Sequence, residues 1–171
     1  PGALSGPTRA VFALLFALSG FAALAFQIAW VRLFGLMFGS SVYSFSAILG
    51  VYLLGLALGS AAIARRVGHG ASLVHFGRLQ LALALCAAVM TAFFPRLPDW
   101  MLAAGRAAGP NWGALFASEV ALTAALLLAP CALLGAVFPV AIRLLQRHEA
   151  GHAAGFGYAV NTAGTIAGSL T

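Results

Sequence analysis

The sequence predicts an all-α protein whose helices cross a membrane. Of its 171 residues, 63% are hydrophobic and only 7% are charged, and the mean hydropathy is +1.02. Soluble domains carry about 25% charged residues, so a chain this poor in charge does not stay in water as a monomer. Its apolar residues also fall into long runs separated by segments rich in Gly, Pro and Arg. These observations predict a polytopic transmembrane helix bundle, one membrane domain over residues 1–171, with four full spans and a truncated fifth.

The first two spans are the longest stretches with few polar residues. The first is expected from about Ala10 to Val31, with Gln27 near its far end, and the second from Val42 to Ala64. At about 1.5 Å per residue, each is long enough for a hydrocarbon core of about 30 Å. Gly55 and Gly59 form a small-xxx-small pair in the second span, which predicts close approach of another helix.

The third and fourth spans are separated by a segment with turn-forming composition. The third is expected from Leu73 to Phe94 and the fourth from Trp112 to Val137. Residues 95–111 contain several Gly and Pro residues, which predicts an exposed loop. Pro130 should kink the fourth span, and Pro139 should end or bend it.

The fifth span is expected from Phe156 to Thr171, where the sequence ends before a full crossing. Asn161 lies early in this span, where a polar side chain typically caps the helix or bonds to a neighbouring helix. Gly164 and Gly168 form a second small-xxx-small face, so this helix should pack inside the bundle.

The basic residues indicate an orientation. The nine basic residues, all Arg, give a net charge of +6 but lie beside separate apolar runs, so no nucleic-acid partner is expected. If the N-terminus is cytoplasmic, more arginines fall inside than outside, as the positive-inside rule requires. The inside set is Arg9, Arg65, Arg66, Arg78, Arg143 and Arg147, and the outside set is Arg32, Arg96 and Arg106.

The stretch HEAGH matches the zinc-binding pattern HExxH, which makes a membrane metalloprotease a minor alternative. His148 and His152 would be the ligands and Glu149 the general base. The pattern requires a continuous helix, whereas Gly151 and Gly155 interrupt this stretch, and a third ligand is missing. We therefore expect no metal and no cofactor, and no residue of the chain is assigned a catalytic role.

Glu119 is the acidic residue that lies inside a predicted span. A charged side chain in a membrane costs about 2.5–3.5 kcal/mol on insertion scales, which makes Glu119 a candidate for function. Gln27 and Arg32, near the outer end of the first span, would then line a polar cavity with it. The alternative is structural: Glu119 reaches the headgroups or pairs with Arg32 or Arg106, while Gln27 and Arg32 act as interfacial anchors beside Trp30.

Three stretches resemble the membrane region of the fused transporter-like/spermidine synthase proteins of bacteria. They are QIAWVRLFGLMFGSSVYSFSAILGVYLLGLALGS, LLGAVFPVAIRLL and GYAVNTAGTIAGS. In that family a multi-span domain, described as similar to the major facilitator superfamily, precedes a soluble aminopropyltransferase-like domain. The resemblance implies the bacterial cytoplasmic membrane and a link to polyamines. It adds weight to the residues within the matching stretches, namely Gln27, Arg32, Tyr43, Tyr158 and Asn161.

Two functions follow from these patterns. The leading one is a transporter-like membrane domain of a spermidine-synthase-like protein that handles a small solute or a polyamine. Any aminopropyltransferase activity would lie in the family's C-terminal domain, which is not within these 171 residues. The alternative is a structural or assembly subunit that joins other membrane helices or subunits through its small-residue faces.

Overall fold

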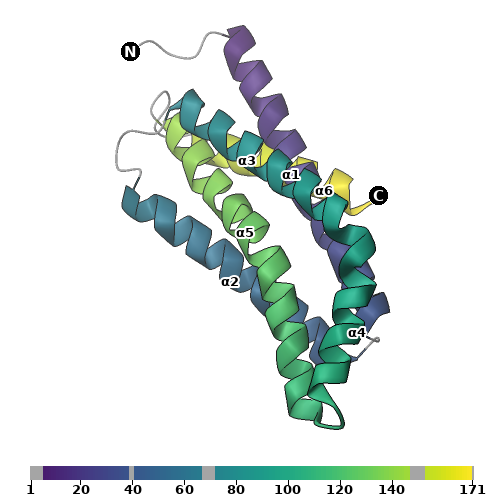
Figure 1. Cartoon of the computed structure of the whole chain (residues 1–171). Coiled ribbons are helices and arrows are strands. Elements are labelled where there is room, and N and C mark those ends of the chain that lie inside the picture. The colour runs from purple at the N-terminus through teal and green to yellow at the C-terminus, as the bar shows by residue number, and fades with distance from the viewer. Residues whose placement is uncertain (1–5, 39–40, 67–71, 147–152, 171) are drawn as a thin grey trace.

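The computed structural model is a bundle of long helices that run up and down between two ends (Figure 1). It describes residues 6–38, 41–66, 72–146 and 153–170. In chain order the elements are α1 (Gly6–Phe38), α2 (Val42–Arg66), α3 (Leu73–Phe93), the 3₁₀ turn η1 (Phe94–Arg96), α4 (Leu97–Ala108), α5 (Trp112–Gln146) and α6 (Ala153–Ser169).

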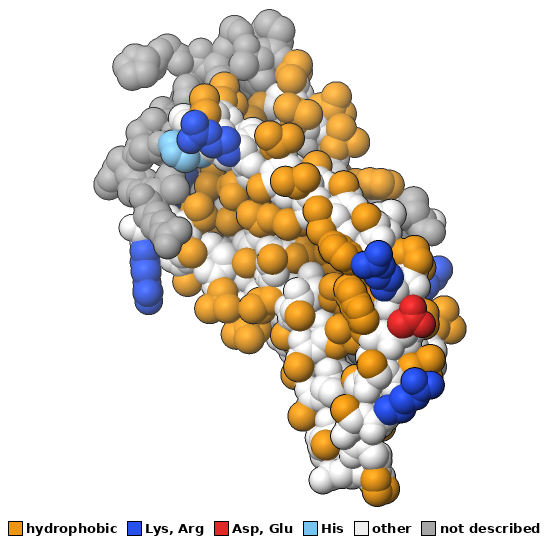
Figure 2. All heavy atoms as spheres, viewed as in Figure 1, with side chains coloured by type: hydrophobic (Ala, Val, Ile, Leu, Met, Phe, Trp, Pro, Cys, Tyr) orange, Lys and Arg blue, Asp and Glu red, His pale blue; other side chains and the backbone are white. Residues whose placement is uncertain are grey.

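The structure confirms the all-α membrane fold. Four segments are long and apolar enough to cross a bilayer: Ala10–Met37, Val42–Arg65, Leu73–Ala108 and Trp112–Leu144. The helix of the predicted fifth span, α6, has 17 residues, which corresponds to about 26 Å and is shorter than a hydrocarbon core of about 30 Å. Figure 2 shows a surface covered by hydrophobic side chains, with the charged side chains gathered in two groups that a hydrophobic belt separates. Lipid is the environment that suits such a belt.

The exposed loop predicted over residues 95–111 was wrong. The chain continues from α3 through η1 into α4, and only residues 109–111 link α4 to α5. Pro95 and Pro98 occupy the first turns of η1 and α4, where a missing backbone N–H costs nothing because that group has no partner within the helix. Gly109 ends α4 with a φ of 57°, a conformation that glycine adopts without strain.

The two prolines of the fourth span do not end its helix. Pro130 and Pro139 both lie inside α5, which continues to Gln146. The predicted end at Val137 was therefore too early. Each proline removes one backbone hydrogen bond, and transmembrane helices tolerate this loss because neighbouring helices support the segment.

Helices α1 and α6 pack in direct backbone contact. A Cβ atom at Gly164 would overlap the carbonyl oxygen of Ala17, and one at Gly168 would overlap that of Phe21. The contact moves from Ala17 to Phe21 along α1 as it moves from Gly164 to Gly168 along α6, so the two helices run parallel. The expected packing face of Gly164 and Gly168 is thus confirmed. Gly20 lies against Asn161, and a Cβ at Gly20 would be 2.6 Å from the Asn161 carbonyl oxygen.

Helices α2 and α5 form a second parallel pair of the same kind. Gly59 of α2 faces the carbonyl oxygen of Ala132, and Gly135 of α5 faces that of Leu56, so each helix contributes a glycine to the contact. Gly55 lies against Cys131, as its place in a small-xxx-small pair predicts.

Large side chains fill the spaces between the two pairs. One buried cluster joins α1, α3 and α5 and comprises Phe12, Phe16, Phe76, Val137, Val140, Ala141 and Leu144. A second cluster joins α1, α2, α3 and α5 and comprises Phe34, Ile48, Val51, Met90, Leu127 and Cys131. Helix α5 contacts each of the other α-helices, which makes it the centre of the bundle.

Replacing Gly164 or Gly168 by Leu should destabilise the full-length protein in detergent. The added side chain must displace a backbone carbonyl of α1, and overpacking of this kind costs about 1–3 kcal/mol. Gly155→Leu is the matched control on the same helix, because nothing lies within 4 Å of a Cβ at Gly155. Thermal unfolding followed by circular dichroism measures the effect. Equal melting temperatures for all three variants would contradict the observed α1–α6 contact.

The α2–α5 contact is testable with a smaller substitution. Gly59→Ala places a methyl group on the Ala132 carbonyl oxygen and should lower the melting temperature. Gly50→Ala, on the same helix, meets nothing within 4 Å, and it should be neutral or slightly stabilising because Ala favours helix by about 1 kcal/mol over Gly. The contact is refuted if Gly59→Ala behaves like Gly50→Ala.

Candidate functional site

The candidate polar residues lie at several separate places. Asn161 lies in the α1–α6 contact beside Gly20. Tyr158 is exposed, and its ring meets that of Phe138 edge to face at 5.9 Å. Arg32 is exposed on α1. The structure brings together only Tyr43 and Glu119, while Gln27 lines a different cavity.

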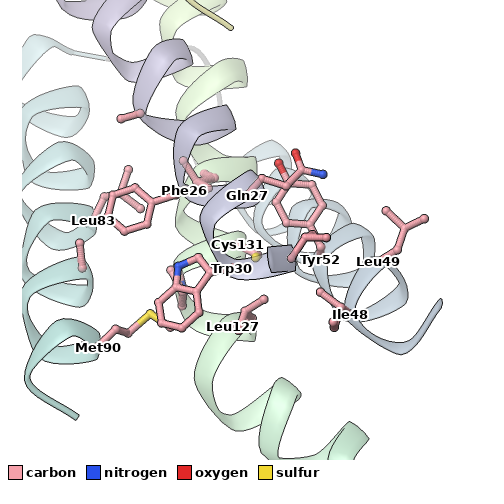
Figure 3. Close-up of a pocket in the computed structure, with 15 residues that line it drawn as sticks. Phe26, Gln27, Trp30, Ile48, Leu49, Tyr52, Leu83, Met90, Leu127 and Cys131 are labelled. Atoms are coloured by element: carbon pink, nitrogen blue, oxygen red, sulfur yellow. The ribbon is translucent and has the colours of Figure 1, made fainter. Parts of the chain in front are cut away.

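The cavity at Gln27 lies between α1, α2, α3 and α5. Figure 3 shows it surrounded mainly by apolar side chains, among them Phe26, Trp30 and Met90. Gln27 and Tyr52 contribute amide and hydroxyl groups to its lining. Its volume is about 40 Å³, and one water needs about 10–15 Å³ measured in this way. The cavity therefore has room for a few waters but not for a solute, and Gln27 does not share it with Glu119 as expected.

A larger pocket lies where the first turns of α2 and α5 meet. Because these helices run parallel, their N-terminal ends lie at the same end of the bundle (Figure 1). The pocket has a volume of about 230 Å³. We call it the end pocket, and its lining residues are Ser41, Tyr43, Ser44, Trp112, Leu115, Phe116 and Glu119.

Three aromatic rings form two walls of the end pocket. Trp112 and Phe116, one turn apart on α5, are stacked with centroids 5.5 Å apart and an interplanar angle of 1°. Tyr43 of α2 stands nearly perpendicular to both, at 5.4 Å from Trp112 and 6.4 Å from Phe116. The rings therefore meet as a corner between the two helices.

Two serines close the α2 side of the pocket. The Ser44 backbone N–H donates to Ser41 Oγ at 3.1 Å, which caps the start of α2. The two hydroxyls lie 2.8 Å apart and share a hydrogen bond. Without this cap, the Ser44 N–H group would have no acceptor within the helix and would need one from outside it.

Glu119 supplies the charge of the end pocket. The residue is half-buried, and its backbone carbonyl oxygen accepts a hydrogen bond from Thr123 Oγ1 at 2.8 Å. The proposed ion pairs with Arg32 and Arg106 do not form among the described residues. Glu119 lines the end pocket, whose lining contains aromatic rings and hydroxyl groups but no basic side chain, and it also lines a small pocket between α4 and α5.

The length of α5 places the end pocket near the membrane surface. This helix has 35 residues, or about 52 Å, which exceeds a hydrocarbon core of about 30 Å by about 20 Å. Near the opposite end, Arg143 donates from Nη1 to the Ile63 carbonyl oxygen at 3.5 Å. A membrane boundary close to Arg143 leaves Trp112 and Phe116 beyond the hydrocarbon core on the other side, within reach of headgroups and water.

The sequence identified Tyr43 and Glu119 but not the two α5 rings beside them. The signal was present, since Trp112, Phe116 and Glu119 are spaced by four and three residues and share one helix face. The HEAGH residues His148, Glu149 and His152 lie outside the described residues. No protein-family model, curated protein sequence or solved structure matches the chain.

Proposed function

We propose that the chain is a transporter-like membrane domain that takes a small solute into the end pocket. The supporting observation is the half-buried carboxylate of Glu119 in a pocket of about 230 Å³ between two helices. A pocket into which a few polar groups converge is characteristic of ligand-binding sites. The resemblance to the fused transporter-like/spermidine synthase proteins of bacteria favours a polyamine as this solute and the bacterial cytoplasmic membrane as the location.

The alternative of an assembly subunit receives less support. It rested on small-residue faces that were expected to bind other subunits. The structure engages these faces within the chain, because Gly164 and Gly168 contact α1 while Gly55 and Gly59 contact α5. These glycines are therefore not available for contacts with other proteins.

We also propose that the N-terminus is cytoplasmic and that the end pocket opens outward. The C-terminal ends of α2 and α5, with Arg65 and Arg143, lie at the same end of the bundle, opposite the end pocket. The excess of arginines at that end supports its cytoplasmic assignment.

Cysteine accessibility tests this orientation. In a background with Cys86→Ser and Cys131→Ala, single cysteines at Gly68 and Gly105 should label from opposite sides of sealed vesicles. An impermeant maleimide should reach Gly105→Cys from outside and Gly68→Cys only after permeabilisation. Labelling of both positions from the same side would refute the proposed topology.

Transport tests the function directly. Full-length protein in proteoliposomes should take up radiolabelled spermidine faster than protein-free vesicles, and Glu119→Gln should reduce the rate about tenfold, since it removes the charge facing a cation. Asp99→Asn is the matched control, because Asp99 is exposed on α4 and does not line the end pocket. Uptake that equals protein-free vesicles for spermidine and for a panel of small solutes would rule the proposal out.

A further inference from the structure

We propose that the end pocket is a recognition site for an ammonium group, held between the aromatic walls of Tyr43, Trp112 and Phe116 and the carboxylate of Glu119. This inference rests on the proposed solute site and adds the chemistry of its ligand. The inference concerns only the binding of an ammonium group, so a binding assay tests it without a measurement of transport.

The charge of the pocket selects a cation. Glu119 is the charged side chain in its lining, and the chain contains no lysine. Arg106 lines a separate pocket with Met37 between α1 and α4. An anion would meet the Glu119 carboxylate, and the capped start of α2 does not offer it the Ser44 N–H, which already bonds to Ser41.

The aromatic walls select an ammonium ion over a metal cation. A cation within about 6 Å of a ring centroid is attracted by the negative face of the ring, and cages of aromatic side chains are a known means of binding alkylated ammonium groups. The three rings contact one another, with centroids 5.4–6.4 Å apart, so an ammonium group in the pocket meets the ring faces that the Trp112–Phe116 stack leaves free. A metal ion would require several oxygen ligands, whereas the Ser41 and Ser44 hydroxyls bond to each other, which leaves the Glu119 carboxylate and the Tyr43 hydroxyl in the lining.

Two sources of ammonium groups reach this place. One is a soluble alkylammonium compound in the outer medium. The other is the headgroup of an ammonium-bearing lipid such as phosphatidylethanolamine, because the α5 rings lie at headgroup level. Both molecules present the same ammonium chemistry to the pocket, so an experiment has to identify which of them binds.

The probe is tetramethylammonium chloride, titrated into the full-length protein in maltoside detergent. The chain has three tryptophans, so Trp30→Phe with Trp100→Phe leaves Trp112 as the reporter in this chain, and any Trp beyond residue 171 is also replaced by Phe. Its fluorescence should change saturably with tetramethylammonium but not with sodium chloride at equal ionic strength. Neopentyl alcohol, similar in shape but uncharged, should bind at least tenfold more weakly.

Two variants assign the binding to the pocket. Phe116→Leu removes one aromatic face and should weaken binding about five- to thirtyfold. Glu119→Gln removes the charge at nearly constant volume and should weaken it about tenfold. Phe138→Leu is the matched control, because this ring packs against Phe16 and Tyr158 away from the pocket, and its affinity should equal that of the parent.

The lipid arm uses nanodiscs made of phosphatidylglycerol with increasing phosphatidylethanolamine. If the lipid headgroup is the natural occupant, the apparent tetramethylammonium affinity falls as phosphatidylethanolamine rises. If a soluble ammonium compound is the occupant, the affinity stays constant. Either result supports the ammonium site and identifies its source.

The proposal is overturned if tetramethylammonium and neopentyl alcohol bind the parent equally, or if neither binds. It is also overturned if Phe116→Leu and Glu119→Gln retain the parent affinity. The first comparison needs no substitution in the end pocket, so it holds even if Phe116→Leu or Glu119→Gln prevents folding. Transport without ammonium binding would sink this inference and leave the proposed function standing, whereas binding without transport would do the reverse.

Discussion

The bundle depends on contact between backbones, in which a carbonyl oxygen of one helix lies over the Cα of a glycine in another. In lipid there is no hydrophobic gain from bringing two helices together, so close van der Waals packing has to supply the association. The contacts of Gly164 and Gly168 with α1, and of Gly59 with α5, supply it here. At each of these positions a Cβ atom would coincide with backbone, which moves far less readily than the end of a side chain. The two parallel pairs are therefore sensitive to single methyl groups.

The end pocket is a product of the same contact. Parallel packing of α2 and α5 puts both N-terminal ends at one end of the bundle, which brings Tyr43 beside Trp112 and within the same pocket as Glu119. An antiparallel arrangement would place Tyr43 beside the other end of α5, near Arg143. The alternation of the spans gives α2 and α5 the same direction, and the glycine contacts determine how closely the two helices approach.

The sequence predicted where the helices lie better than it predicted which helices pack against each other. Hydropathy alone located the apolar spans, and the spacing of Gly164 and Gly168 predicted a packing face because that rule is local to one helix. Residues 95–111 were misjudged because Pro95 and Pro98 stop a helix in its interior but suit its first turn, and composition does not distinguish the two positions. Nothing local indicated which helices pack together, so neither the α1–α6 pair nor the separate locations of Gln27 and Glu119 were predictable from the spans alone.

The pairing of α1 with α6 has a consequence for biosynthesis. The two faces that meet, near Ala17 and Gly164, are separated by nearly the whole chain. At a synthesis rate of about 5–20 residues per second, the roughly 150 intervening residues take about 8–30 s to emerge. During that interval α1 resides in the bilayer with the carbonyls of its partner face turned to lipid or to the insertion machinery. The contact between α1 and α6 therefore forms later than the α2–α5 contact, whose members lie closer together in the sequence.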